Sequence, residues 1–508
     1  MPCKVPFACP QCLHRTAMFR RALTGIWSPI ISLCLRRPLI TKRKLNIRTF
    51  TMNQFPPPSN AKLETYSVKG IKVIERFFDL PLDYSDPDGE KIRVFARNLI
   101  PKSKAKTAKD EEELPYLVYL QGGPGYEIPF PNISGYAAEI HEQGYQTLWM
   151  DPRGTGLSTH ISPESLPAHL TTDQTIADYL KFFRADSIVK DCEAIREILL
   201  GHKPSPEDRK WTILGQSFGG FCAITYLSFH SEGLKEVFTT GGLAPLVDQP
   251  DSVYAATVLR VMKRNKTYYD KYPQDIQRVR NIMSYLETNE VSVSNGGRLS
   301  PNRFQHLGMD FGMHGGIDRV HQLVFRAAND LDTFGHLTYK TIQLVEQAQS
   351  FDGNPIFSIL HEAIYCQGHA SKWAATRTLQ DYPQFCWSSV KHLADSEPIY
   401  FTGEMIFPSM FDDYANLRPL KGAAEIIAQY DGWGQLFDLQ QLSKNEVKVS
   451  SVSYFDDMYV DFDLAQDTAA KIKNTEQYVT NQLVHSGLRA DPKDVMKHLF
   501  QLSKREYD

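Results

Sequence analysis

The segment Gly215-Gln216-Ser217-Phe218-Gly219 has the residue types and spacing of a turn that presents a reactive serine. The apolar run Trp211–Leu214 before it predicts a short buried strand, and the apolar run Gly220–Ile224 after it predicts a helix. Glycines two residues before and after the serine suit a sharp strand-to-helix turn, where larger side chains would collide. Such a turn holds the hydroxyl at a helix N-terminus, which favours developing negative charge. The segment therefore predicts that Ser217 is a nucleophile.

A nucleophilic serine needs a base and an acid that orients the base. On sheets that carry this turn, the acid and then a histidine follow the serine along the chain, each just after a strand. His485 follows the expected strand 477–483 and is the only histidine between positions 393 and 497, so it is the expected base. The expected strand 447–455 is followed by four possible acids: Asp456, Asp457, Asp461 and Asp463.

Backbone N–H groups should stabilise the oxyanion that forms when the serine attacks a carbonyl. One is expected from Phe218, the residue after the nucleophile, and another from Gly123 in the loop Gln121–Gly125. This loop follows the expected strand Tyr116–Leu120, and its glycines let the backbone approach a substrate without a Cβ in the way. Gly-Gly-Pro-Gly is also common in ordinary turns. The functional interpretation of this loop therefore depends on the reactive-serine turn that follows it in the chain.

The segment Asp151–Ser158 follows the next expected strand, Thr147–Met150. We expect it to form a tight turn in which Asp151 and Arg153 pair beneath the site. This role is structural support, not catalysis.

Short apolar runs alternate with helical patterns around these motifs, which predicts parallel strands joined by helices. The remaining strand-like runs are 71–74, 92–96, 237–240 and 424–429, and helices are expected over 187–200, 465–474 and 491–502. Residues 248–417 are helical and irregular. We therefore expect an α/β fold with a mostly parallel central sheet and a large helical insertion. Its parts are a leader (1–62), the first half of the sheet (63–247), a helical cap (248–417) and the second half of the sheet (418–508).

The composition excludes some classes of partner. The chain has 42% hydrophobic and 23% charged residues and a net charge of −3, so neither nucleic acid nor an anionic membrane surface is expected. Residues 1–62 contain no Asp or Glu and many Arg and Lys, as organelle-targeting peptides do, and their apolar stretch 23–35 is too short to span a bilayer. Either this leader targets mitochondria, or it is a tail or an over-extended start ahead of Met52. We expect a cytoplasmic protein, or a mitochondrial one if the leader is a transit peptide.

Cysteine usage agrees with a reducing compartment. Four of the eight cysteines lie outside the leader, in apolar or aromatic surroundings that predict buried thiols: Cys192, Cys222, Cys366 and Cys386. In the leader, Cys9 and Cys12 form a single C-x-x-C with no second pair at zinc-site spacing. We expect no metal and no cofactor.

Together these motifs resemble the proline iminopeptidases (prolyl aminopeptidases) of the α/β-hydrolase superfamily, particularly their fungal members. The family pattern His-Gly-Gly-Pro-Gly, Asp-x-Arg-Gly-x-Gly-x-Ser and Gly-x-Ser-x-Gly-Gly is similar to Gln121–Gly125, Asp151–Ser158 and Gly215–Gly220. Asp457, which precedes Met458, matches the family's acid, and His485 matches its base. The resemblance spans about residues 65–505 and implies an α/β-hydrolase fold.

The resemblance implies release of an N-terminal residue, preferably proline, from a peptide with a free N-terminus through an acyl-enzyme on Ser217. In this family acidic cap residues hold the substrate's α-amine, and by position Glu362 is the first candidate and Glu404 the second. An ammonium group taken out of water needs a fixed carboxylate partner. Either glutamate could instead be solvated or structurally paired. Gln121, where the family has histidine, should change what supports its loop, and the longer cap could admit N-terminal residues other than proline.

Two other functions fit parts of the pattern. An esterase or amidase could use the same scaffold, because the triad does not choose the acyl group. A non-catalytic binder of this fold would typically lack one of Ser217, Asp457 and His485. An epoxide hydrolase or dehalogenase would need Asp where Ser217 stands. The sequence does not give the oligomeric state.

Overall fold

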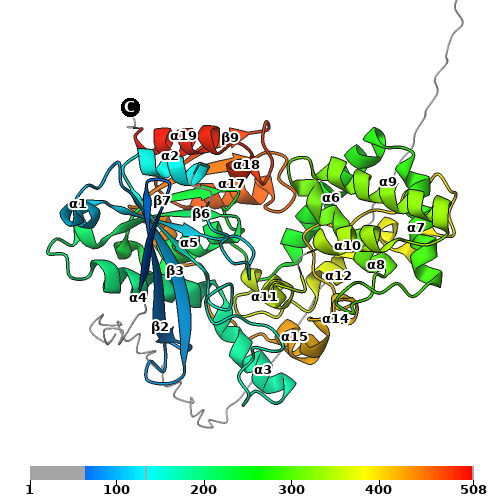
Figure 1. The fold of residues 1–508 in the computed structure, drawn as a ribbon, viewed down its shortest axis with the longest axis horizontal. Coiled ribbons are helices and arrows are strands. Elements are labelled where there is room, and N and C mark those ends of the chain that lie inside the picture. Colours follow the sequence, from blue (N-terminus) through cyan, green and yellow to red (C-terminus); the bar gives the residue numbers. More distant parts are fainter. Residues whose placement is uncertain (1–62, 132–133, 350, 506–508) are drawn as a thin grey trace, which may run out of the picture. The chain divides into compact units, whose positions relative to one another are not determined.

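The computed structural model describes residues 63–131, 134–349 and 351–505 (Figure 1). The leader 1–62, with Met52 and the pair Cys9 and Cys12, lies outside the described residues. Residues 55–508 form one compact unit.

A nine-stranded sheet in the order β1-β2-β3-β5-β4-β6-β7-β8-β9 organises the fold. Strands β4 to β9 pair in parallel, and β1, β2 and β3 form an antiparallel edge that joins β5. The mostly parallel sheet expected from the sequence is therefore confirmed. The strands are β1 (Glu64–Val68), β2 (Ile71–Pro81), β3 (Lys91–Pro101), β4 (Tyr116–Leu120), β5 (Gln146–Met150), β6 (Trp211–Gln216), β7 (Leu234–Thr240), β8 (Lys448–Tyr454) and β9 (Thr475–Thr480).

Helices cover both faces of the sheet, so the central strands are buried on both sides and are mostly apolar. Every residue of β4, β5 and β6 is buried. Alternate residues of β4 enter different clusters: Val118 packs with α4 and α5, whereas Leu117 packs with α2 and α19. The helices around the sheet are α1 (Ala108–Glu113), α2 (Tyr136–Glu142), α3 (Asp173–Leu180), α4 (Ala185–Leu200), α5 (Phe218–Phe229), α16 (Leu439–Ser443), α17 (Phe462–Lys471), α18 (Gly487–Ala490) and α19 (Pro492–Ser503).

Between β7 and α16 every regular element of the described residues is a helix, and many of these helices share a second hydrophobic core, which includes Val261, Ile282 and Val324. Helices α6, α7, α9 and α10 group together in Figure 1. The helices of this region are α6 (Asp251–Lys271), α7 (Asp275–Thr288), α8 (Pro301–Gln305), α9 (Gly316–Phe334), α10 (Tyr339–Gln347), α11 (Pro355–Leu360), α12 (Ala374–Leu379), α13 (Trp387–Val390), α14 (Met410–Asp413) and α15 (Lys421–Gln429).

The helical insertion does not coincide with a single hydrophobic core. Segments α11 and α15 contribute Leu360 and Ile427 to the core around the sheet, although both lie between β7 and β8. The division into 63–247, 248–417 and 418–508 therefore stays a prediction.

The strand expected at 424–429 is wrong, because these residues belong to α15. The helix buries Ala423, Ala424, Ile427 and Ala428, which recur at the three- and four-residue spacing of one helix face. A short apolar run cannot separate a buried strand from a buried helix by its pattern alone.

In the part of the chain that the structure describes, no helix combines the length and the apolar character needed to cross a membrane.

Arg153 ties the loop after β5 to α4. Its Nη2 and Nε lie 2.6 Å and 2.7 Å from the two carboxylate oxygens of Asp191, and both side chains are fully buried. The expected pairing of Asp151 with Arg153 is therefore wrong. Asp151 instead accepts hydrogen bonds from the backbone N–H groups of Ile128 and Leu157, each at 2.9 Å.

Replacing Asp191 by Ala would leave the Arg153 charge buried without its carboxylate. We expect the free energy of unfolding to fall by about 3–5 kcal/mol, measured by urea denaturation followed by circular dichroism. The matched control is Asp270→Asn, which breaks an exposed pair with Lys266 and should cost less than about 1 kcal/mol. Equal losses in the two variants would contradict a stabilising role for the buried pair.

Candidate active site

Ser217 lies between β6 and α5 in a strained backbone conformation, with φ 56° and ψ −126°. A positive φ at a residue with a Cβ is uncommon and is retained only where the surroundings enforce it. The N–H of Ser217 donates to the carbonyl of Thr240 at the end of β7, at 3.1 Å. A Cβ on Gly215 would overlap Gly219, and a Cβ on Gly219 would overlap the carbonyl of Leu120. The two glycines thus permit the close backbone packing that fixes the turn.

Asp457 and His485 meet after β8 and β9. His485 Nδ1 lies 2.8 Å from Asp457 Oδ2, and both side chains are buried. The other carboxylate oxygen of Asp457 accepts the N–H groups of Tyr459 and Val460, at 2.8 Å and 3.1 Å. Burial lowers the pKa of His485, but the charge and hydrogen bond of Asp457 raise it more, so the net pKa lies above 6.5.

The other three aspartates after β8 bind basic residues of α6 instead of His485. Asp456 pairs with Lys263 at 2.5 Å. Asp461 and Asp463 both pair with Arg260, at 2.7 Å and 3.2 Å. Of the four candidate acids, only Asp457 therefore lies within hydrogen-bond distance of His485.

Ser217 and His485 line the same cavity, but within the described residues no hydrogen bond joins the Ser217 hydroxyl to the imidazole. His485 Nε2 lies 3.4 Å from the side-chain nitrogen of Gln216 instead. Contacts between a nucleophile and its base are often long without substrate and tighten in the complex.

The loop after β4 brings backbone N–H groups to the serine. Gly122 and Gly123 line the cavity, and the φ of Gly123 is 131°, a value that favours glycine. Phe218 is the first residue of α5, where helical N–H groups have no partner within the helix. The side chain of Gln121 donates to the carbonyl of Glu127 at 3.0 Å and so supports this loop from within.

The cavity has a volume of about 280 Å³, at the small end of ligand pockets. Residues from the loops after β4, β6, β8 and β9 form one side, and residues between α8 and α14 form the other. The lining residues include Tyr126, Met309, Phe351, Phe357, Glu404 and Arg489.

Glu404 and Glu362 have different surroundings. Glu404 lines the cavity, and burial raises its pKa to about 7, with Asp457 adding to the rise and His485 opposing it. Among the described residues no hydrogen bond or ion pair is formed by its carboxylate. Glu362 is 5% exposed, does not line the cavity, and accepts the N–H groups of Ala374 and Ala375 at the start of α12, at 3.0 Å and 2.9 Å.

Most of the residues that line the cavity were not predicted from the sequence, and Gln216 and Arg489 are the two that matter most for the chemistry. Gln216 is the residue before Ser217, a position at which the Gly-x-Ser-x-Gly motif accepts any residue type. Arg489 lies on the short helix α18, which begins two residues after His485, and no sequence motif marks it.

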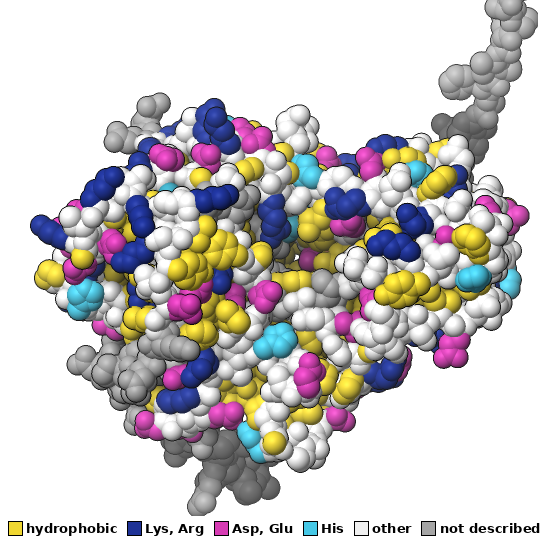
Figure 2. Space-filling model, viewed as in Figure 1, with side chains coloured by type: hydrophobic (Ala, Val, Ile, Leu, Met, Phe, Trp, Pro, Cys, Tyr) yellow, Lys and Arg dark blue, Asp and Glu magenta, His cyan; other side chains and the backbone are white. Residues whose placement is uncertain are grey.

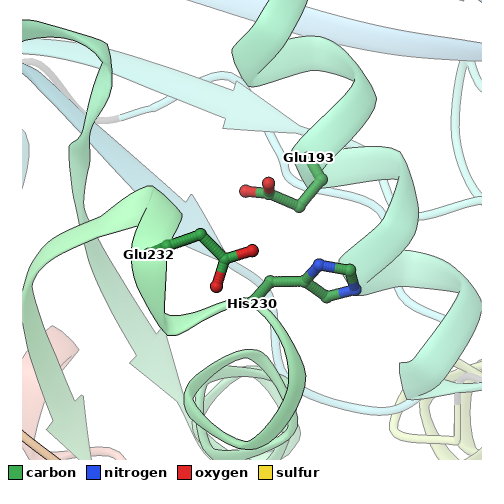
Figure 3. A group of neighbouring side chains, drawn as sticks. All are labelled: Glu193, His230 and Glu232. Atoms are coloured by element: carbon green, nitrogen blue, oxygen red, sulfur yellow. The ribbon is translucent and has the colours of Figure 1, made fainter. Parts of the chain in front are cut away.

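In the described part of the chain, one group of side chains is close enough together to hold a metal ion: Glu193, His230 and Glu232 (Figure 3). Arg196 already binds both carboxylate oxygens of Glu193, at 2.8 Å each, and so neutralises the charge a cation would need. Glu232 lies two residues before the first residue of β7, so the group lies at the end of the strands opposite to Ser217, which follows β6. Glu193 thus belongs to a buried ion pair with Arg196, whereas Glu232 is exposed.

Known proteins share the fold and much of the sequence of this chain. Residues 115–290 match the family model for the alpha/beta hydrolase fold. The chain is 42% identical over 431 residues to a proline iminopeptidase of Aspergillus aculeatus, covering 85% of this chain and 93% of that protein. It is 41% identical over 440 residues to a proline iminopeptidase of Aeromonas sobria, covering 86% of this chain and 98% of that protein.

Replacing Asp457 by Asn should lower the pKa of His485, because the charge that raises it is lost. A neutral histidine is the active base, so reaction of Ser217 with a fluorophosphonate should rise with pH through this pKa, and the rise should move to lower pH in the variant. The maximal labelling rate should fall on the order of 10³- to 10⁴-fold, because Asn favours the wrong tautomer. The control Asp456→Asn removes an equal charge from the neighbouring residue and should stay near wild type. Equal labelling by the two variants would exclude Asp457 as the orienting acid.

Proposed function

Since the chain belongs to the proline iminopeptidase family, we propose that it is a serine aminopeptidase that releases an N-terminal residue, preferably proline, from peptides. The observation that carries this proposal is the half-buried carboxylate of Glu404, which lines the same cavity as Ser217. A serine hydrolase that requires a free α-amine needs a negative charge at a fixed distance from the nucleophile.

Ser217 attacks the carbonyl of the first residue, and His485 accepts the hydroxyl proton. Asp457 keeps the imidazole oriented and stabilises its charged form. The N–H groups of Phe218 and Gly123 receive the oxyanion. Collapse of the tetrahedral intermediate breaks the peptide bond while His485 gives its proton to the leaving amine. Water then hydrolyses the acyl-enzyme with His485 as the base.

Glu404 is the proposed partner of the substrate's ammonium group. Its carboxylate has lost much of its hydration, which raises its pKa to about 7, and an incoming cation would restore the missing interaction. Glu362 takes second place because its two oxygens already cap α12. This order is the reverse of the one expected from the sequence.

The walls of the cavity suit a small apolar residue. Aromatic and thioether side chains line it, including Tyr126, Phe351, Phe357 and Met309. A proline ring could pack against them while its nitrogen meets Glu404. These contacts support a preference for proline, and the small volume argues against large N-terminal side chains.

A reducing compartment such as the cytoplasm is the proposed location. The cysteines in the described part of the chain are free, and Cys192, Cys222 and Cys366 are buried, as expected, whereas Cys386 is exposed. Figure 2 shows basic and acidic side chains intermixed on the face that it draws, which supports peptides over nucleic acid as partners.

The proposed activity predicts a sharp order of substrates for protein purified from residue 52 onward. Proline anilide should be cleaved fastest, alanine anilide more slowly, and N-acetylproline anilide not measurably, because blocking removes the ammonium group. Ser217→Ala serves as the blank, and chromogenic release is the measurement. Turnover of a simple acetate ester without turnover of proline anilide would identify an esterase instead.

Glu404→Gln should raise KM for proline anilide about 10- to 100-fold, because a charge-assisted contact to the ammonium group is lost, and should change ester hydrolysis much less. In the wild type KM should rise as pH falls below about 7, where Glu404 becomes protonated, and this dependence should disappear in the variant. Glu362→Gln is the matched control: it should lower the melting temperature through loss of the α12 cap and change KM little. A larger KM effect from Glu362→Gln would assign the amine to that residue.

A further inference from the structure

Arg489 places a positive charge in the same cavity as Glu404. It lies on α18, is exposed, and lines the cavity with Ser217 and His485. Within the described residues its guanidinium forms no ion pair, and its Nη2 donates to the side-chain oxygen of Gln216 at 3.4 Å. An arginine without a carboxylate partner in a substrate cavity is free to bind an anion.

The side chain of Gln216 connects this guanidinium to the catalytic base. Its oxygen accepts from Arg489, and its nitrogen lies 3.4 Å from His485 Nε2. The charge of Arg489 also acts on His485, where it opposes the rise in the pKa of the imidazole. Arg489 is therefore one amide group away from the nitrogen that delivers a proton to the leaving amine.

This position defines which part of a substrate could reach the arginine. The nitrogen of the leaving residue must lie beside His485 Nε2 to receive its proton. In a dipeptide the carboxyl carbon of that residue is only two covalent bonds from this nitrogen. A planar guanidinium matches a carboxylate with two parallel hydrogen bonds.

We propose that Arg489 determines specificity by binding the carboxylate of the leaving residue, so that dipeptides with a free C-terminus are the preferred substrates. This inference rests on the proposed aminopeptidase activity and extends it to the leaving-group side. Glu404 would hold the ammonium group and Arg489 the carboxylate of one zwitterionic dipeptide.

Kinetics with prolyl-glycine and prolyl-glycine amide test the inference, because the two differ only in the carboxylate. In the wild type, kcat/KM should be about 10-fold or more higher for the free acid. Arg489→Gln should bring this ratio close to one, and Arg489→Lys should retain part of it. High salt should lower the wild-type ratio, since an exposed ion pair is screened.

A structural role through Gln216 or His485 would slow both substrates alike and leave the ratio unchanged, so the ratio separates the two roles. Arg505→Gln is the matched control: it removes an exposed arginine beside Lys448, at the start of β8 and the opposite edge of the sheet. This variant should keep the wild-type ratio. Prolyl-aspartyl amide distinguishes a side-chain carboxylate: if Arg489 matters for this compound and not for prolyl-glycine, the inference is overturned.

Binding to the Ser217→Ala variant separates failure of this inference from failure of the proposed activity. Calorimetry should show tighter binding of prolyl-glycine than of its amide, and Arg489→Gln in the same background should remove the difference. Arg489-dependent binding without turnover by the wild type would support the carboxylate site and refute the activity. Efficient turnover of both compounds with an unchanged ratio in Arg489→Gln would refute the carboxylate site alone.

Discussion

The close packing of backbone around Ser217 is the constraint on which the site depends. Gly219 has no side chain, so the first turn of α5 lies against the carbonyl of Leu120, where β4 ends. The same contact brings the start of the Gln121–Gly125 loop beside the helix N-terminus. The strained φ of Ser217 and the approach of its oxyanion loop are thus two results of one packing arrangement. A side chain at Gly219 would disturb both together.

The helical cap is attached to the loops that carry the acid and the base. Arg260 and Lys263 of α6 bind aspartates just after β8, on either side of Asp457. Across the cavity, the backbone N–H of His314 donates to the hydroxyl of Ser486, the residue after His485, at 3.0 Å. The aspartates that do not orient His485 therefore hold the cap. This arrangement couples the position of Glu404, which belongs to the cap side, to the position of the triad.

The structure could be predicted from local sequence where the backbone geometry permits only a few residue types. The elbow glycines around Ser217 and the apolar strands of the parallel sheet are such cases, and the fold class followed from them. The structure could not be predicted from local sequence where the outcome depends on packing against segments that are distant in the chain. Residues 424–429 became a helix through packing on the sheet's core, and Arg153 bonded to Asp191 instead of its neighbour Asp151. Glu362 and Glu404 look equivalent in sequence, but only the start of α12 decides which of them is already engaged.

Glu404 and Arg489 are charged side chains in the cavity, and keeping them there without partners costs folding stability. A partly desolvated carboxylate without a partner destabilises the folded protein, and an apolar residue in place of Glu404 would remove that cost. Such groups are concentrated at functional sites, where a bound ligand supplies the opposite charge. Within residues 63–131, 134–349 and 351–505, Glu404 has no cationic partner and Arg489 has no anionic one, and both line one cavity with Ser217 and His485. A short zwitterion satisfies both groups at once, whereas an internal peptide segment satisfies neither. If Glu404 and Arg489 act as proposed, selection for chain ends would follow from charge compensation as well as from the size of the cavity.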